Sequence, residues 1–280
     1  MREISAATIT KAIRDMCIEA NYGLAPDMRK VFEKAVEEEE SPLGRQVLEQ
    51  LKENLRIAGE DSIPICQDTG MAVVFMKIGQ DVHITGERLA DAVNEGVRQG
   101  YEQGYLRKSV VGDPIERINT KDNTPAVIHC EITDGEQIDI TVAPKGFGSE
   151  NMSRVFMLKP ADGLEGVKKS ILQAVREAGP NACPPMVVGV GIGGTMELAC
   201  LLAKRAAARD LGSRNADARY AALERELLEM LNKTGIGPQG LGGSTTALAV
   251  HVEWAPTHIA SLPVAVNINC HAARHAEALL

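Results

Sequence analysis

The chain has 280 residues, a formal net charge of −8 and only 3% aromatic residues. This length can bury one large core or two smaller ones. The acidic balance, the lack of a basic run and the scarcity of aromatic side chains exclude a typical nucleic-acid binder. No stretch approaches the roughly 18 apolar residues of a membrane span, and the first residues lack a signal-peptide pattern. We therefore expect a soluble cytoplasmic protein.

The first part of the chain is predicted to be helical, over about residues 1–60. Three segments carry apolar residues at helical spacing: residues 4–21, 26–38 and 43–59. Four consecutive glutamates occupy positions 37–40. Consecutive helical side chains point around the axis rather than to one centre, so we expect this run to be a solvated helix end and not a metal site.

The body of the chain, about residues 61–280, mixes helical and strand patterns. Strands are expected at 71–78, 126–132, 137–143, 186–190, 247–252 and 263–268. Helices are expected at 84–101, 164–178, 195–208 and 216–232. The strands 126–132 and 137–143 are predicted to form a hairpin across the turn at 133–136. No linker or internal repeat interrupts the chain. The prediction is an α+β fold in a single domain, 1–280, with a mixed or antiparallel sheet.

A glycine-rich segment, Gly189–Gly194, satisfies the pattern G-x-G-x-x-G between an apolar run and a helix. This arrangement is typical of a dinucleotide-binding turn and supports an alternative function as an NAD-binding oxidoreductase. However, the apolar run is short, and another helix follows where a second strand with a ribose-binding acid belongs. The glycines could equally bring the backbone close to an anion or cofactor at a helix N-terminus.

The six cysteines fall into two groups. Three lie beside glycine, proline or amide residues that favour turns, so their thiols can leave regular structure and converge: Cys66, Cys183 and Cys270. The other three lie in helical or apolar patterns and are expected to pack in the core: Cys17, Cys130 and Cys200. Without a secretory signal, reduced thiols or metal ligands are favoured over disulfides.

Three thiolates form an unusual ligand set. Structural zinc takes four ligands at short paired spacings, which this chain lacks. A [4Fe–4S] cluster held by three cysteines would leave one iron open to bind a substrate oxygen. Buried cysteines in tight turns would explain the same spacing, and the residue types leave both interpretations open.

Several motifs, spread in order over the whole chain, strongly resemble the α subunit of class I, iron–sulfur fumarate hydratases, a family shared with L-tartrate dehydratase. They are Pro64–Gly70, Tyr105–Val110, Asn181–Pro185, Gly189–Thr195 and Leu262–His275. The resemblance implies that Cys66, Cys183 and Cys270 bind a [4Fe–4S] cluster in a cleft, with the fourth iron free for substrate.

The same resemblance implies which residues bind the substrate. They are Gln67, Asp68, Arg107 and a glycine of the loop 145–151, for which we choose Gly148 over Gly146. Asp68 is also the expected catalytic residue, in proton transfer or in orienting another acid–base group. On residue type alone, it would rather be a turn anchor. Phe147 departs from the all-glycine form of this loop.

The expected reaction is the reversible hydration of fumarate to L-malate, with L-tartrate dehydration as the alternative. Single-chain relatives carry a further domain that supplies cations and a base, so the resemblance implies a β subunit, in a heterodimer or a dimer of heterodimers. Lys108, Lys145 and Arg274 could bind substrate carboxylates, but most exposed basic side chains are merely solvated, so we assign them no catalytic role. His258 and His275 could relay protons or support the cluster, but an isolated histidine is more often an ordinary packed or surface residue.

Overall fold

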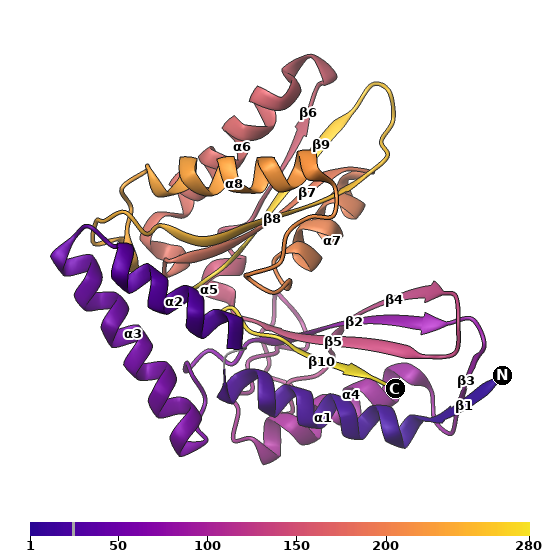
Figure 1. Ribbon diagram of the computed structural model, residues 1–280. Helices are drawn as coiled ribbons and strands as arrows, with labels where there is room; N and C mark the ends of the chain where they lie inside the picture. Colours follow the sequence, from indigo (N-terminus) through magenta and orange to yellow (C-terminus); the bar gives the residue numbers. More distant parts are fainter. Residues whose placement is uncertain (24–25) are drawn as a thin grey trace. The chain divides into compact units, whose positions relative to one another are not determined.

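The computed structural model describes residues 1–23 and 26–280 (Figure 1). The chain divides into two compact units. The first comprises Met1–Leu24, Leu55–Phe147 and Arg274–Leu280, and the second comprises Ala25–Asn54 and Gly148–Ala273. Each unit has its own four-stranded sheet and its own apolar core. The predicted α+β class is confirmed, and the single domain over 1–280 stays a prediction. None of the helices in the described ranges is both long and apolar enough to cross a membrane.

The first unit packs two helices against a mixed sheet of order β10-β5-β2-β4. Its elements are β1 (Arg2–Ser5), α1 (Ala6–Tyr22), the end of α3 (Pro42–Asp61), β2 (Met71–Gly79), β3 (Val82–Thr85), α4 (Leu89–Gln103), β4 (Val127–Thr133), β5 (Ile138–Lys145) and β10 (Ala276–Leu279). The Ser5 hydroxyl accepts the Thr8 N–H and caps α1. A Cβ at Gly96 of α4 would lie 2.7 Å from the Ile13 Cβ, so a glycine there lets α1 and α4 pack closely.

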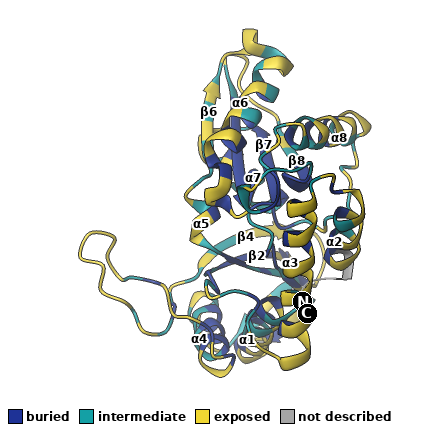
Figure 2. Cartoon of the chain, turned by 90° about the vertical axis from the view of Figure 1, so that its left-hand side faces the viewer, coloured by how far each residue is buried: buried dark blue, intermediate teal, exposed yellow. Residues whose placement is uncertain are grey.

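The predicted hairpin is wrong, although both of its strands exist. β2 lies between β4 and β5, parallel to the first and antiparallel to the second. Nearly all of β2 is buried, whereas β4 is mostly exposed (Figure 2). The apolar strand therefore takes the central position, and the turn at 133–136 passes over its end, where the Gln80 N–H donates to the Thr133 carbonyl.

The second unit has a sheet of order β6-β9-β7-β8 between two helical layers (Figure 1). Helix α7 covers one face, and α6 and α8 cover the other. Its elements are α2 (Pro26–Glu38), the start of α3, most of α5 (Phe147–Glu150), β6 (Arg154–Leu158), α6 (Gly163–Ala178), the 3-10 turn η2 (Gly179–Ala182), β7 (Met186–Gly193), α7 (Met196–Ala206), α8 (Ala218–Asn232), the 3-10 turn η3 (Pro238–Gly240), β8 (Ala247–Ala255) and β9 (Leu262–Asn269).

The G-x-G-x-x-G segment serves packing in this sheet. Gly189 and Gly191 lie inside β7, not in the turn after it. A Cβ at Gly191 would lie 2.0 Å from the Ala199 backbone oxygen, and one at Gly189 would lie 2.1 Å from the Ala203 oxygen. These glycines therefore let α7 rest directly on the strand, which differs from a turn that cradles a dinucleotide.

Most of the other predicted elements match the structure, with differences at the borders. The three N-terminal helices are confirmed, but the short strand β1 precedes them. The helix predicted from residue 84 begins only at Leu89, because Ile84 belongs to β3, which pairs with β1. Strands β6 and β10 were not predicted. Both lie at sheet edges and are short, so their sequence patterns are weak.

Candidate active site

The loop from Cys66 to Gly70, which carries two predicted substrate residues, is fixed by buried side chains of the first unit. The Tyr101 hydroxyl donates to the carbonyls of Thr69 (2.8 Å) and Gly70 (3.0 Å). Asn123, fully buried, donates to the Gly70 carbonyl and accepts the Ser109 N–H. Burial raises the pKa of Tyr101, which keeps its hydroxyl a neutral donor. These contacts join the loop to the segment that follows Arg107.

Asp68 has both carboxylate oxygens bound by backbone N–H groups. Oδ1 accepts from Gly70 (3.0 Å), and Oδ2 accepts from Phe147 (2.9 Å). The Arg274 guanidinium donates to the Asp68 backbone oxygen through Nη2. The bond to Gly70 is the turn anchor that the residue type indicated, while the bond to Phe147 aims the carboxylate at the loop 145–147.

Arg107 and Gln67 present exposed side chains beside this loop. The Thr69 hydroxyl donates to the Arg107 carbonyl at 3.1 Å, which ties the backbone at Arg107 to the loop. The Cys66 thiol, half-buried, lies 3.4 Å from the Gln67 Oε1. The first unit thus brings together three predicted substrate residues and one predicted cluster ligand.

Cys183 and Cys270 belong to the second unit and lie on adjoining segments. Cys183 ends the 3-10 turn η2 with φ 50°, in the left-handed region, and its side chain is exposed. The His271 N–H donates to the Cys183 carbonyl at 3.2 Å, so the chain directly after Cys270 touches Cys183. Gln239 donates to the Pro184 carbonyl through its backbone N–H and through Nε2, both at 2.8 Å.

The loop that carries Gln239 is held at its far end by Glu39. This carboxylate is fully buried and accepts the N–H groups of Ser41 (2.9 Å), Ser244 (2.8 Å) and Thr245 (2.8 Å). Burial acts to raise the pKa of Glu39, but these hydrogen bonds outweigh it and leave the pKa below its ordinary value. The predicted solvated run 37–40 is thus wrong at Glu39 and right at the other three positions, which are exposed.

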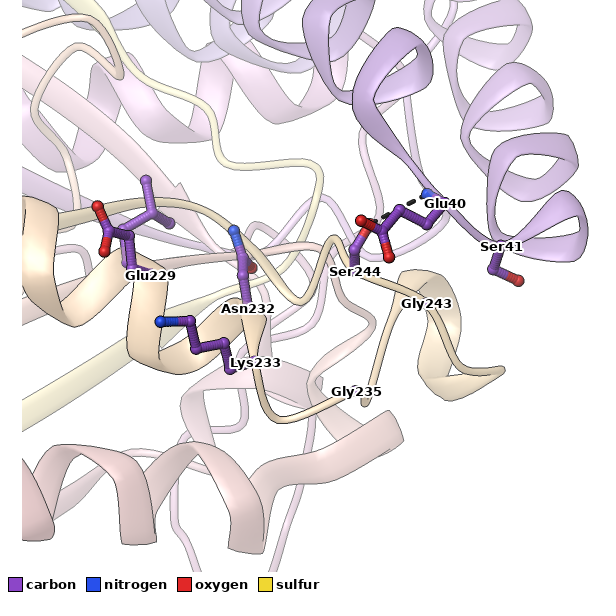
Figure 3. A pocket seen from close by; sticks show the side chains of 9 residues that line it. Glu40, Ser41, Glu229, Asn232, Lys233, Gly235, Gly243 and Ser244 are labelled. Atoms are coloured by element: carbon purple, nitrogen blue, oxygen red, sulfur yellow. Dashed lines mark hydrogen bonds between the residues drawn. The ribbon is translucent and has the colours of Figure 1, made fainter.

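A pocket of about 730 Å³ opens beside this loop, and none of the predicted site residues lines it (Figure 3). Its wall mixes acidic, basic and amide side chains with the loop backbone: Glu40, Ser41, Leu228, Glu229, Asn232, Lys233, Gly235, Gly243 and Ser244. The Ser244 hydroxyl accepts the Glu40 N–H across its rim. Asn232 is structural, because its Oδ1 accepts the N–H groups of Thr246 and Ala247.

The three remaining cysteines differ from one another. Cys17 is fully buried as predicted, and burial raises its pKa to about 12, so it stays a thiol at neutral pH. Cys130 and Cys200 are exposed, which contradicts their predicted core packing. Cys130 lies on the edge strand β4, and Cys200 follows Ala199, one of the α7 residues that pack on the sheet.

The predicted site residues are thus distributed over both units. Within either unit, as far as it is described, no three Cys, His, Asp or Glu side chains gather around one metal position. Gly148 belongs to the second unit, where a Cβ on it would lie 3.8 Å from the Asn181 oxygen. Gly146 lies beside Asp68 in the first unit. The convergence of the three thiols and the choice of Gly148 stay predictions.

Sequence reasoning missed the side chains that hold these segments: Tyr101, Asn123, Glu39 and Gln239. Only Gln239 carried a usable signal, its place in the glycine-rich run 235–243. The other three stand in ordinary helical or polar patterns.

Residues 10–279 match the family model described as Fumarate hydratase (Fumerase). The chain belongs to this family. A Methanocaldococcus jannaschii protein provisionally named L(+)-tartrate dehydratase subunit alpha is 42% identical over 274 residues, which is 96% of each chain. The L(+)-tartrate dehydratase subunit alpha of Escherichia coli O157:H7 is 35% identical over 246 residues, covering 86% of this chain and 80% of the relative. The subunit of the same name from Escherichia coli strain K12 has the same identity and coverage.

Proposed function

We propose that this chain is the α subunit of an iron–sulfur hydro-lyase that removes water from L-tartrate, with fumarate hydration as the second candidate reaction. The observation that carries the proposal is the similarity to tartrate dehydratase α subunits over nearly the whole chain. On this ground we place L-tartrate before fumarate, which is the reverse of the order expected from the sequence motifs. The family match keeps fumarate as an alternative, and both substrates are four-carbon dicarboxylates.

Cys66, Cys183 and Cys270 have the donor chemistry for a [4Fe–4S] cluster. Two observations support this: each thiol lies outside helices and strands, and none of the three is fully buried. Thiols placed in turns can be deprotonated and can turn towards iron, unlike Cys17 in its helix. When bound, such a cluster supplies a Lewis acid for the substrate oxygen that departs as water.

The residues around the Cys66–Gly70 loop fit the binding and proton steps. The exposed Arg107 guanidinium can bind a substrate carboxylate through its planar fork, and the Gln67 amide can donate a further hydrogen bond. Asp68 is oriented by two backbone N–H groups and keeps lone pairs for a proton from the substrate carbon. Loss of that proton and of a hydroxyl from the neighbouring carbon yields the enol of oxaloacetate from tartrate, or fumarate from malate.

A β subunit is part of the proposal, because the relatives named above are themselves named as α subunits. We expect the partner to complete the site with further cationic and acid–base groups, in a heterodimer or a dimer of heterodimers. The isolated α chain should then bind iron but turn over substrate only slowly.

The test is anaerobic purification of the α chain, alone and with its partner, followed by iron and sulfide analysis and assays of both reactions. We expect about four irons and four sulfides per chain and faster loss of L-tartrate than hydration of fumarate. Faster fumarate hydration would restore the order of substrates expected from the motifs. Well-folded complex without iron and without either activity would overturn the proposal.

A further inference from the structure

Arg274 is a buried cation without an acidic partner in the part of the chain that the structure describes. The residue is 6% exposed, and its Nη2 donates to the Asp68 backbone oxygen. The other two guanidinium nitrogens, Nε and Nη1, are enclosed and have no acceptor among the residues that the structure describes. No carboxylate of the described chain forms an ion pair with it.

This arrangement is costly unless an anion joins it. The guanidinium stays charged at every physiological pH, and buried charges in proteins are normally paired. A neutral carbonyl oxygen satisfies one donor but leaves the charge uncompensated. The missing group is therefore an anion that can accept hydrogen bonds from Nε and Nη1.

The surroundings of Arg274 indicate where such an anion can lie. Gly146 faces both Arg274 and Asp68: a Cβ built on it would lie 3.9 Å from Nη2 and 3.3 Å from the Asp68 Oδ2. Even a methyl group would crowd the Asp68 carboxylate at this position, so the glycine keeps the approach to both groups open. Arg274 donates to the Asp68 carbonyl, and the hydroxyl of the next residue, Thr69, donates to the Arg107 carbonyl. These two bonds connect Arg274 and Arg107 to the same loop.

We propose that Arg274 binds one carboxylate of the dicarboxylate substrate through the donors that Asp68 leaves unused. The inference rests on the proposed function and deepens it, because it adds a second cation on the α chain to Arg107. A dicarboxylate held by Arg107 and Arg274 would be fixed at both ends, so that its central carbons can be presented to the Asp68 carboxylate.

The experiment measures binding of succinate, a four-carbon dicarboxylate without a hydroxyl to lose, to the reconstituted complex by calorimetry. The variants are Arg274→Gln, Arg274→Lys and Gly146→Ala, and the control is Arg88→Gln, which removes an exposed arginine of the first unit. We expect Arg274→Gln to weaken succinate binding about tenfold or more. Arg274→Lys should restore part of the affinity, and Gly146→Ala should lower it by obstructing this approach.

Thermal unfolding without ligand gives a second readout. Here Arg274→Gln should not impair the protein, although it should weaken succinate binding. Removing an uncompensated buried charge should leave the midpoint of Arg274→Gln equal to or above that of the unchanged protein. A lowered midpoint together with unchanged succinate affinity would show a purely structural arginine and overturn the inference. If Arg274→Gln fails to fold, Arg274→Lys and Gly146→Ala still decide the binding question.

The anion could instead be the thiolate and sulfide charge of the cluster, since Arg274 follows Cys270 by four positions. If Arg274→Gln binds less iron and sulfide per chain but keeps normal succinate affinity, the cluster is the anion that Arg274 meets. This outcome would overturn the substrate assignment. Normal turnover by the unchanged complex, with equal succinate affinity in Arg274→Gln, would overturn this inference alone. A complex that neither binds succinate nor acts on L-tartrate or fumarate would overturn the proposed function with it.

Discussion

Replacing Glu39 by glutamine changes one atom at the centre of a fully buried hydrogen-bond cluster. Oε1 accepts two backbone N–H groups, from Ser41 and Ser244, and Oε2 accepts the Thr245 N–H at 2.8 Å. Gly243 closes on the same carboxylate, since a Cβ there would lie 2.6 Å from Oε1. Glutamine fits this space and keeps one acceptor oxygen. Its amide nitrogen, however, replaces the other oxygen and would face a backbone N–H, which is also a donor.

The expected cost follows from counting the bonds that change. One charge-assisted hydrogen bond is lost, which costs about 1.5–3 kcal/mol, and the remaining bonds become neutral and weaker. We therefore expect Glu39→Gln to lower the free energy of unfolding by about 2–4 kcal/mol. Burial of the altered group prevents water from replacing the lost acceptor.

The pH dependence has a definite sign. The pKa of Glu39 is lowered in the folded protein, so its carboxylate contributes stability above the ordinary glutamate pKa. That contribution decreases as the pH falls from the ordinary value and is lost once the pH passes through the lowered folded pKa. Glutamine does not titrate, so the difference in stability between Glu39→Gln and the unchanged protein should shrink over the same range.

The assay is urea unfolding at several pH values, with Glu37→Gln as the matched control. Glu37 lies two positions earlier and is exposed, so its replacement should cost less than about 0.5 kcal/mol. Equal costs for the two variants at neutral pH would refute the reasoning. So would a cost for Glu39→Gln that stays constant from neutral to acidic pH.

The other predictions concern the thiols, the sheet and the Arg107 segment. Cys183→Ser should reduce iron and sulfide per chain to well below half, while Cys200→Ser leaves both near normal; equal losses contradict the ligand assignment. Gly191→Ala should lower the free energy of unfolding by more than about 3 kcal/mol, because its Cβ would lie 2.0 Å from a backbone oxygen of α7. Urea unfolding measures this loss, and a near-neutral effect would contradict the close packing of α7 on β7. Thr69→Val should raise KM several-fold and lower the free energy of unfolding by only about 1 kcal/mol, because the Arg107 carbonyl loses one hydrogen bond. An unchanged KM contradicts the proposed role of Arg107.

The borders of many elements could be predicted because their signals are local. The helix expected at 26–38 is α2, and the one expected at 164–178 is α6 with one more residue. Periodic apolar positions within a few turns are sufficient for this. Strand pairing is different: the hairpin prediction was wrong because β2, more than 45 positions earlier, is the better central strand.

The candidate site shows the same division. Turn-prone flanks singled out Cys66, Cys183 and Cys270, and ordered motifs identified the family, both from residues close together in sequence. The pattern of Gly189–Gly194 suggested a dinucleotide-binding turn, whereas its first two glycines pack against α7. The sequence pattern could not predict this, because it does not show which element lies over a strand.

The sequence by itself determined the family, the positions of most helices and strands, and the residue types offered to metal and substrate. Only the tertiary structure decided that Glu39 is buried and that the buried Arg274 meets no carboxylate among the described residues. Glu39 meets Ser244 across 205 positions, and Arg274 meets Asp68 across 206. Propensity and chemical type belong to single residues and their neighbours, whereas burial and the partners of a charge depend on segments that folding brings from far along the chain.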